Sequence, residues 1–391
     1  MRFSFQRCEG PGAAEGTESR GKEMETIIRG IEGIEEAAEI IRRGGLVAFP
    51  TETVYGLGGN ALSPEAARKI YAAKGRPSDN PLIVHVSGIK DAEPLVTEIT
   101  EDARRLMARF WPGPLTLILR KTEKIPRETS GGLDTVALRC PENACALRLI
   151  LESGVPIAAP SANLSGKPSP TEAGHVAKDL GGRIDMILDG GPVGIGVESS
   201  ILDLSTGAPI LLRPGAVTAE ELSAFLGQKV GIDPAILSGT VSETVHPRAP
   251  GMKYRHYAPE AEMYLVTTRL FRERGEAIGR EERELSDRRT ARWIRERAER
   301  ELSEGRRVGI LCVKETRPFY PPDSPDGTLS VKVLGSREEM LTMTRSLFRL
   351  LREFDEEKKD RIYAESCSDR GVGFALMNRM RKAAGMREII L

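Results

Sequence analysis

The feature that most constrains the fold is a helix signal that runs directly into a strand signal between residues 63 and 86. Ser63 and Pro64 are residue types favoured at the N-cap and the first position of a helix, and Gly75 is typical of a helix end. The apolar run 82–86 predicts a strand. The chain must therefore change from helix to strand within the short loop between them.

This loop also brings cations together. Lys74, Arg76 and the Asn80 amide can lie side by side, where Lys supplies a point charge and Arg a forked pair of donors for phosphate oxygens. The loop therefore predicts a site for a polyanion. The alternative is an ordinary solvated helix end, where cations are favourable because they face the negative end of the helix dipole.

Short apolar strands that end in polar loops bounded by Gly or Pro recur along the chain, together with helical segments. This layout is usual for an α/β protein that binds its ligand at the strand ends. We expect helices at 34–43 and 102–110, and strands at 46–49, 115–119, 134–139, 156–159, 197–204 and 211–213.

The loop 50–59 follows the first of these strands. It combines hydroxyl groups, a carboxylate and clustered glycines, which suit a small polar ligand that the backbone approaches closely. An ordinary glycine-rich turn is the alternative.

The segment 156–171 is the densest polar stretch. Ser161, Asn163, Ser165 and Ser169 carry oxygens and an amide that can bind phosphate or a hydrated Mg²⁺. The segment is not a P-loop, because Ser161 and Pro168 stand where that motif requires Gly and Ser or Thr.

Two single side chains stand out on predicted strands. His85 is out of phase with the apolar residues Leu82, Val84 and Val86. A hydrogen-bonded structural histidine is the ordinary interpretation, and a ligand contact is the alternative. Arg139, at the exit of the strand 134–139, would direct a fixed fork of donors toward whatever lies over the sheet.

Composition limits the class of function. Lys+Arg and Asp+Glu both number 57, and a net charge of zero argues against binding nucleic acid through bulk charge, although a local patch remains possible. The five cysteines form no paired CxxC motif, so neither a zinc site nor a disulfide framework is indicated. No apolar run approaches the ~18 residues of a membrane span. A reducing cytoplasm fits best.

The length of 391 residues predicts two or three domains. We expect residues 1–23, rich in Gly, Glu, Arg and Ser and without the apolar segment of a secretory signal, to be a disordered N-terminal extension. Residues 24–242 would form the main domain, 243–260 a connector, and 261–391 a smaller α/β domain. The last part carries no catalytic cluster, so a covering or regulatory role is expected.

The connector 243–260 is unusual for a linker. Its prolines keep it extended, and it contains Lys253, Tyr254, Arg255, His256 and Tyr257. We predict that it folds back over the ligand site as a lid that excludes water. The alternative is a passive spacer between two independent domains.

Together these segments resemble the L-threonylcarbamoyladenylate synthases, in the long form with a YrdC-like catalytic domain and a C-terminal extension. The resemblance rests on Lys74-x-Arg76 with Ser161-x-Asn163, on the loop 50–58, and on the connector sequence Pro-Gly-Met-Lys-Tyr-Arg-His-Tyr-Ala-Pro at 250–259. It implies a strongly twisted mixed sheet with flanking helices, followed by a smaller Rossmann-like α/β domain.

The resemblance implies an activity as well. L-Threonine, bicarbonate and ATP, accompanied by Mg²⁺, would give L-threonylcarbamoyl-AMP and pyrophosphate. The product would pass to the tRNA threonylcarbamoyltransferase machinery, which modifies adenosine 37 of tRNAs that read ANN codons. The enzyme would be a cytoplasmic nucleotidyltransferase that needs no membrane; contact with RNA is possible but not required.

The resemblance also implies roles for individual residues. Catalytic roles would fall to Lys74, Arg76, Ser161 and Asn163. ATP binding would involve Lys74, Arg76, Asn80, Thr135, Ser161, Ser169, Arg213 and His256. L-Threonine binding would involve Thr53, His85, Arg139, the Ala159 carbonyl and Ser199. No protein ligand for the metal is assigned, since Mg²⁺ would be held through the ATP phosphates.

Two other classes of function are open at this point. An RNA-binding module without catalysis is disfavoured by the zero net charge and by an aromatic content of 5%. A carbamoyltransferase of the hydrogenase-maturation type would carry an acylphosphatase region and zinc-finger-like Cys clusters, and the sequence contains neither.

Overall fold

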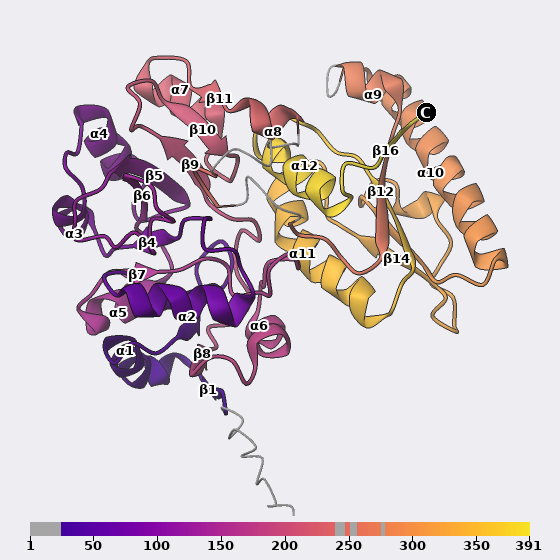
Figure 1. Cartoon of the computed structure of the whole chain (residues 1–391). Coiled ribbons are helices and arrows are strands. Elements are labelled where there is room, and N and C mark those ends of the chain that lie inside the picture. Colours follow the sequence, from indigo (N-terminus) through magenta and orange to yellow (C-terminus); the bar gives the residue numbers. More distant parts are fainter. Residues whose placement is uncertain (1–24, 239–246, 251–255, 275–277) are drawn as a thin grey trace, which may run out of the picture.

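The computed structural model describes residues 25–238, 247–250, 256–274 and 278–391. In these ranges the chain forms an 11-stranded mixed sheet and a separate five-stranded parallel sheet, both accompanied by helices (Figure 1). The expected fold class, a mixed α/β sheet followed by a smaller α/β domain, is confirmed. The predicted extension 1–23 and residues 243–246 and 251–255 of the connector lie outside the described residues.

The large sheet has the strand order β1-β8-β2-β3-β7-β4-β6-β5-β9-β10-β11. The sheet is mixed, because it contains parallel pairs such as β4 with β6 and antiparallel pairs such as β5 with β6. Its strands are β1 (Ile27–Arg29), β2 (Val47–Phe49), β3 (Gly56–Asn60), β4 (Ile83–His85), β5 (Leu115–Arg120), β6 (Thr135–Arg139), β7 (Ile157–Ala158), β8 (Met186–Leu188), β9 (Ser200–Asp203), β10 (Ile210–Arg213) and β11 (Gly231–Ile232).

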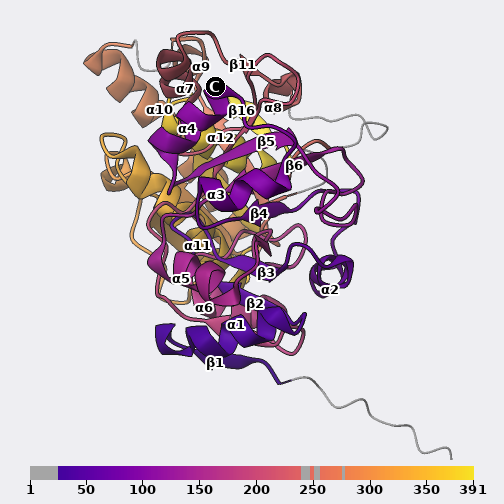
Figure 2. The same ribbon diagram turned by 90° about the vertical axis from the view of Figure 1, so that its left-hand side faces the viewer.

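Helices pack around this sheet, as the view turned by 90° shows most clearly (Figure 2). They are α1 (Ile34–Arg42), α2 (Pro64–Lys74), α3 (Ile89–Ala92), α4 (Glu101–Phe110), α5 (Ala144–Ser153), α6 (Ala173–Leu180), α7 (Ala219–Leu226) and α8 (Pro234–Ser238), with short 3-10 turns at Ile31–Gly33 and Glu93–Leu95.

Helix α2 and strand β4 confirm the predicted helix–loop–strand unit. The Ser63 hydroxyl accepts a hydrogen bond from the Ala66 amide at the N-cap, and Gly75 ends the helix in the left-handed conformation with φ 59°. These caps satisfy backbone groups that a helix end leaves unpaired. The loop that follows delivers the chain to the centre of the sheet.

Strand β3 differs from the expectation, because the glycine-rich segment after β2 forms part of the sheet instead of a loop. It pairs antiparallel with β2, with Val47 opposite Gly58. A Cβ atom on Gly58 would lie 2.7 Å from the Phe49 ring and 2.8 Å from Ile157. The glycines therefore leave room for aromatic and branched side chains packed flat against the backbone, which compensates for their low strand propensity.

The second sheet has the order β14-β13-β15-β12-β16, and all its pairs are parallel. Its strands are β12 (Glu262–Thr267), β13 (Val308–Cys312), β14 (Leu329–Val333), β15 (Arg361–Glu365) and β16 (Glu388–Ile390). Its helices are α9 (Arg269–Arg274), α10 (Arg280–Ser303), α11 (Met340–Glu356) and α12 (Val372–Ala383), with a 3-10 turn at Arg317–Phe319.

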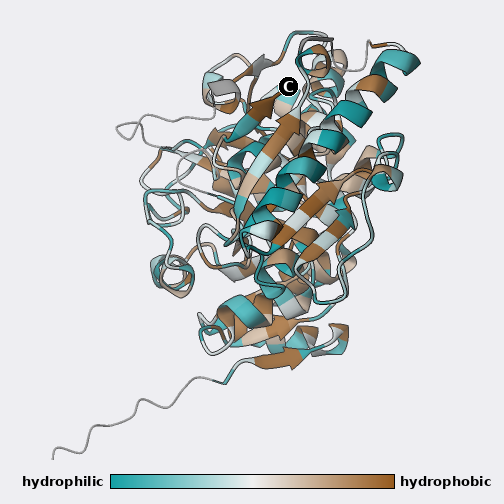
Figure 3. Ribbon diagram, turned by 90° about the vertical axis from the view of Figure 1, so that its right-hand side faces the viewer, coloured by the Kyte–Doolittle hydropathy of each residue, from teal (hydrophilic) through white to brown (hydrophobic). Residues whose placement is uncertain are grey.

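Helix α10 covers the outer face of this sheet (Figure 3). It is strongly hydrophilic on its exposed side, and only a narrow stripe, including Ile294 and Ala298, packs on Val308 and Ile310. Arg and Glu pairs four residues apart, such as Arg292 with Glu296, supply local support along the exposed side.

Helices α11 and α12 lie on the other face of the second sheet, toward the first domain (Figure 1). The core that they form includes Phe348 and Met377, and it also takes in Val54 and Val197 from the first domain. The two sheets are therefore joined by a continuous apolar contact. No helix among the described residues is both long enough and apolar enough to cross a membrane.

We predict that Gly58→Ala destabilises the protein by ~1–3 kcal/mol, the usual cost of overpacking a buried contact. The physical reason is the clash of the new methyl group with Phe49 and Ile157. Chemical denaturation would measure the free energy of unfolding. Gly174→Ala is the matched control, because a Cβ there meets no atom within 4 Å, and it should be neutral or stabilising. Equal stability of both variants would contradict the packing argument.

Candidate functional site

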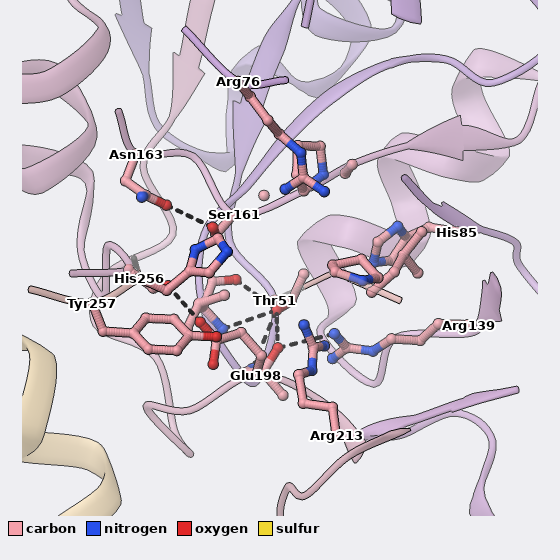
Figure 4. Close-up of a pocket in the computed structure, with 18 of the residues that line it drawn as sticks. Thr51, Arg76, His85, Arg139, Ser161, Asn163, Glu198, Arg213, His256 and Tyr257 are labelled. Carbon is pink, nitrogen blue, oxygen red and sulfur yellow. Dashed lines mark hydrogen bonds between the residues drawn. The ribbon is translucent and has the colours of Figure 1, made fainter. Parts of the chain in front are cut away.

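A pocket with about 600 Å³ of space not filled by protein atoms, open solvent included, lies where strand ends of the first domain meet the described parts of the connector. Figure 4 shows its polar side chains converging from several elements. Its lining residues are Thr51, Thr53, Val54, Gly56, Arg76, Ile83, His85, Arg139, Ala159, Pro160, Ser161, Asn163, Lys167, Ser169, Glu198, Arg213, Pro250, His256 and Tyr257. Four of these carry a positive charge and one a negative charge, so the wall favours anions.

One corner of the pocket is built around Arg139, at the end of β6. Its guanidinium forms an ion pair with Glu52 at 2.7 Å and donates hydrogen bonds to the Thr53 hydroxyl at 2.9 Å and to the Gly113 carbonyl at 3.3 Å. The hydroxyls of Thr51 and Thr53 lie 2.8 Å apart. Because the Arg139 side chain is fixed by three partners and is only 4% exposed, its guanidinium group has one defined orientation in the pocket.

Arg213, at the end of β10, points into the same part of the pocket as Arg139 (Figure 4). It donates from Nε to the Ser199 carbonyl at 2.9 Å and from Nη2 to the Ser199 hydroxyl at 3.1 Å. Burial lowers the pKa of Arg213 to about 10, so the group still carries its charge at neutral pH. Ser199 itself also pairs with Thr116 and does not line the pocket.

The opposite wall combines the loop after α2 with the loop after β7. The Ser161 hydroxyl donates to the Asn163 side-chain oxygen at 2.6 Å, and both side chains face the pocket (Figure 4). The Lys74 ammonium lies behind this pair and donates to the Ser161 and Asn163 carbonyls. Burial, and then the charge of Arg76, holds the pKa of Lys74 well below its usual range.

Arg76 lines the pocket and donates to the carbonyls of Asn80 and Pro81 at 3.1 and 3.0 Å. The Asn80 side chain lies beside this contact, is 1% exposed, and has no hydrogen-bond partner for either amide atom among the described residues. A buried amide without partners is costly. A polar ligand at this position would supply them.

Glu198, at the entrance to β9, is a buried carboxylate on the pocket wall. It accepts from the Ser169 hydroxyl at 2.5 Å and forms an ion pair with Arg379 of α12 at 3.0 Å. Burial acts to raise the pKa of Glu198, but the charges of Arg379 and Arg213 outweigh it and lower the pKa. The carboxylate is therefore ionised.

Two histidines in the pocket are neutral. Burial, followed by the charge of Arg139, lowers the pKa of His85 to about 3; burial, followed by the charge of Arg76, lowers the pKa of His256 to about 3. Neither can supply positive charge near neutral pH. His85 stands edge-on to the Phe49 ring, with centroids 6.1 Å apart.

The pocket brings together most of the residues singled out in the sequence. Its lining includes Thr53, Arg76, His85, Arg139, Ala159, Ser161, Asn163, Ser169, Arg213 and His256. Lys74, Asn80 and Ser199 lie directly behind residues that line it. Thr135 stands at the start of β6, opposite the end that carries Arg139, and does not line the pocket.

Sequence reasoning missed several lining residues, among them Thr51, Glu198 and Tyr257. Tyr257 belongs to the connector that was expected to reach the site, but Glu198 is a single carboxylate at a strand entrance with no local signal. Among the described residues, no group of three or more His, Cys, Asp or Glu side chains is arranged to hold a metal ion.

We predict that His85 makes stability depend on pH. The folded protein holds this ring neutral, with a pKa of about 3, whereas the unfolded chain takes up a proton near pH 6.5. Stability should therefore fall as pH drops below 6.5, and His85 should account for about 2 kcal/mol of that loss at pH 5. Urea unfolding of the wild type and of His85→Gln at pH 7 and pH 5 measures this difference. An identical pH dependence of the two proteins would contradict the prediction.

Comparison with known proteins agrees with this geometry. A Sua5/YciO/YrdC family model, described as telomere recombination, matches residues 39–215, and a model described as threonylcarbamoyl-AMP synthase, C-terminal domain, matches residues 217–385. The chain is 48% identical over 357 residues to the threonylcarbamoyl-AMP synthase of Bacillus subtilis, covering 91% of this chain and 94% of that one. It is 46% identical over 371 residues to that of Pyrococcus abyssi, covering 94% and 99%.

A solved structure gives the same result for the fold. Crystalline P. abyssi Sua5 complexed with L-threonine superposes with a TM-score of 0.81 at 44% identity, covering 94% of this chain and 99% of that one. The resemblance inferred from the motifs is thereby confirmed. The chain belongs to the threonylcarbamoyl-AMP synthase family, in the long form that has a C-terminal domain.

Proposed function

We propose that the chain synthesises L-threonylcarbamoyl-AMP from L-threonine, bicarbonate and ATP, with release of pyrophosphate. The observation that carries the proposal is the meeting of Arg76, Arg139 and Arg213 in one pocket with the paired Ser161 and Asn163 side chains. ATP carries about four negative charges and the amino acid a carboxylate, so such a reaction needs several fixed cations in one water-poor site. An RNA-binding module without catalysis would not need a pocket of this kind.

ATP would lie against Arg76 and Arg213, with Ser161, Asn163 and Ser169 as neutral partners. Asn80 supports this placement, because its buried amide lacks partners among the described residues and lies beside Arg76. Lys74 would act at the same end of the pocket, since its ammonium holds the carbonyls of Ser161 and Asn163. His256 lines the pocket and keeps its proposed place in the nucleotide site, whereas Thr135 does not line the pocket and its contact with ATP stays a prediction.

L-Threonine would lie in the corner around Arg139. The guanidinium would bind the amino-acid carboxylate, and the Thr53 hydroxyl and neutral His85 would face the rest of the substrate. The Ala159 carbonyl would accept a hydrogen bond from it. Ser199 would contribute indirectly, because its hydroxyl and carbonyl orient Arg213.

The chemistry requires positioning more than a nucleophilic side chain. The threonine amine and bicarbonate would first form N-carboxy-threonine, with a new C–N bond and release of water. A carboxylate oxygen of N-carboxy-threonine would then attack the α-phosphorus of ATP, forming an oxygen–phosphorus bond while the bond from the α-phosphorus to the oxygen of the β-phosphate breaks. Pyrophosphate leaves with the electron pair. Arginines fixed in advance lower the barrier by holding the reactants together and by neutralising charge on the leaving group.

The residues present fit a Mg²⁺ ion held mainly by the nucleotide. The pocket offers Ser161 and Asn163 oxygens, while its lining carboxylate, Glu198, is already paired with Arg379. Mg²⁺ usually keeps several waters and binds substrate phosphates with few protein ligands. When bound, it would neutralise phosphate charge.

The remaining expectations follow from the proposed reaction. The product would pass to the tRNA threonylcarbamoyltransferase machinery in the cytoplasm, without a requirement for RNA in the first step. We keep 24–242, 243–260 and 261–391 as the proposed catalytic domain, lid and C-terminal domain. Pro250, His256 and Tyr257, the described connector residues on the pocket wall, support the lid.

Mass spectrometry of the products tests the function directly. Purified protein, ATP, L-threonine, bicarbonate and Mg²⁺ should give a species with the mass of threonylcarbamoyl-AMP, together with pyrophosphate. Omission of bicarbonate or threonine is the control and should abolish both products. ATP consumption that is independent of threonine, or that requires RNA, would overturn the proposal.

We predict that Arg76→Ala lowers kcat/KM about a hundred- to a thousandfold, the usual effect of losing one charged contact to a transition-state phosphate. We expect Lys74→Ala to have a comparable effect, because it also releases the Ser161–Asn163 loop. Release of pyrophosphate at several ATP concentrations measures both. Arg68→Ala, which removes an exposed cation of α2, is the control. Near-normal pyrophosphate release by either site variant would refute the role given to that residue.

The proposed threonine site around Arg139 leads to a prediction about which amino acids the enzyme accepts. A site that hydrogen-bonds a hydroxyl rejects analogues that lack it more strongly than analogues that lack a methyl group. Serine should therefore compete with threonine better than valine does. Competition assays with product masses as the readout would show this, and equal use of threonine and valine would exclude a hydroxyl-binding pocket.

A further inference from the structure

Arg379 connects the C-terminal domain to the pocket. It lies on α12, is 0% exposed, and is the largest of the fully buried side chains among the described residues. Its Nε donates to a Glu198 carboxylate oxygen at 3.0 Å and its Nη1 to the Pro214 carbonyl at 2.5 Å, both in the first domain. Arg379 therefore pairs with a carboxylate that lies 181 residues earlier in the sequence.

The contacts of Arg379 lie on the pocket wall. Glu198 and Tyr257 line the pocket, and the Arg379 guanidinium stands 5.8 Å from the centre of the Tyr257 ring. Pro214 follows Arg213, which lines the pocket as well. One buried guanidinium thus contacts two residues of the wall and the chain neighbour of a third, without lining the pocket itself.

Charge explains why the site needs this contact. Glu198 is an ionised carboxylate in a pocket that must accept anionic substrates, and its ion-pair partner is Arg379. If Arg379 is removed, Arg213 and Lys382 of α12 remain as cations that act on the buried carboxylate, and of these two Arg213 lines the pocket. An ion pair between Glu198 and Arg213 would neutralise the arginine that faces the nucleotide.

We propose that Arg379 is a positioning residue for the adenylation reaction: it neutralises Glu198 and so leaves Arg213 available to the ATP phosphates. The proposal rests on the proposed function, because it takes Arg213 as a phosphate contact. It assigns to the C-terminal domain a part in nucleotide binding, through one side chain that acts on the pocket wall.

The first test is ATP binding by titration calorimetry in the absence of threonine. Arg379→Met should weaken ATP binding about tenfold or more, as expected when one member of a buried charge pair is lost. The KM for ATP should rise likewise, while the KM for threonine changes by less than about threefold, because Arg139 has its own partner in Glu52. Arg379→Lys should restore part of the affinity, since it returns the charge without the fork.

The second test removes the charge that Arg379 balances. In the double variant Glu198→Gln/Arg379→Met, the new amide side chain is neutral and no longer competes for Arg213, so ATP binding should return to within about threefold of the wild type. This double variant also leaves no buried carboxylate without its arginine partner. It therefore provides the test if Arg379→Met alone does not fold.

Arg352→Met is the matched control. Arg352 is also a buried arginine of the C-terminal domain, and it pairs with Asp179 at 2.8 Å and with the Pro168 carbonyl at 2.5 Å. None of these three residues lines the pocket. Arg352→Met should lower the melting temperature about as much as Arg379→Met and leave ATP affinity unchanged.

Two results would overturn the proposal: wild-type ATP affinity in a folded Arg379→Met protein, or a double variant that binds ATP about tenfold more weakly than the wild type. Equal loss of ATP affinity in Arg352→Met would also overturn it, because the effect would then be general loosening of the domain interface. A wild-type protein that binds ATP but forms no threonylcarbamoyl-AMP would refute the proposed function and leave the binding test of Arg379 intact.

Discussion

The structure depends on cations that are buried at the ends of strands and of helix α2 and that are held largely by neutral oxygens. Lys74, Arg139 and Arg213 are 2%, 4% and 7% exposed, and apart from the ion pair of Arg139 with Glu52 their hydrogen bonds go to carbonyls and hydroxyls. Neutral partners satisfy the hydrogen-bonding groups of a cation but do not cancel its charge. The site therefore keeps a positive potential in a region of low dielectric, where it acts strongly on an anionic substrate.

The second domain contributes to this arrangement through packing as well as charge. Its apolar core extends across the interface to Val54 and Val197. Val54 lines the pocket, and Val197 immediately precedes Glu198, which also lines it. Tyr257 of the connector stacks on Phe348 of α11, with ring centroids 5.2 Å apart. The connector is thus anchored to one domain while its side chains line a pocket in the other.

Local features of the fold could be predicted from the sequence, because their causes lie within a few residues. The Ser63 cap, the Gly75 stop and the strand that follows are examples, and the polar loops after the strands identified most of the pocket. The strand β3 could not be predicted, because its glycines are explained by Phe49 and Ile157, which pack against it in space. Glu198 could not be assigned to the site either, because its role depends on the ion pair with Arg379, which belongs to a different domain.

The position of Arg379 in the chain has a consequence for synthesis on the ribosome. The first domain can complete its sheet once β11 has emerged, but the carboxylate of Glu198 lacks its α12 partner until that helix has been translated and docked. Until then the pocket contains a negative charge that competes for Arg213 where phosphates would bind. A nascent chain would therefore bind ATP poorly before α12 has docked, and the reactive mixed anhydride would be made after that step.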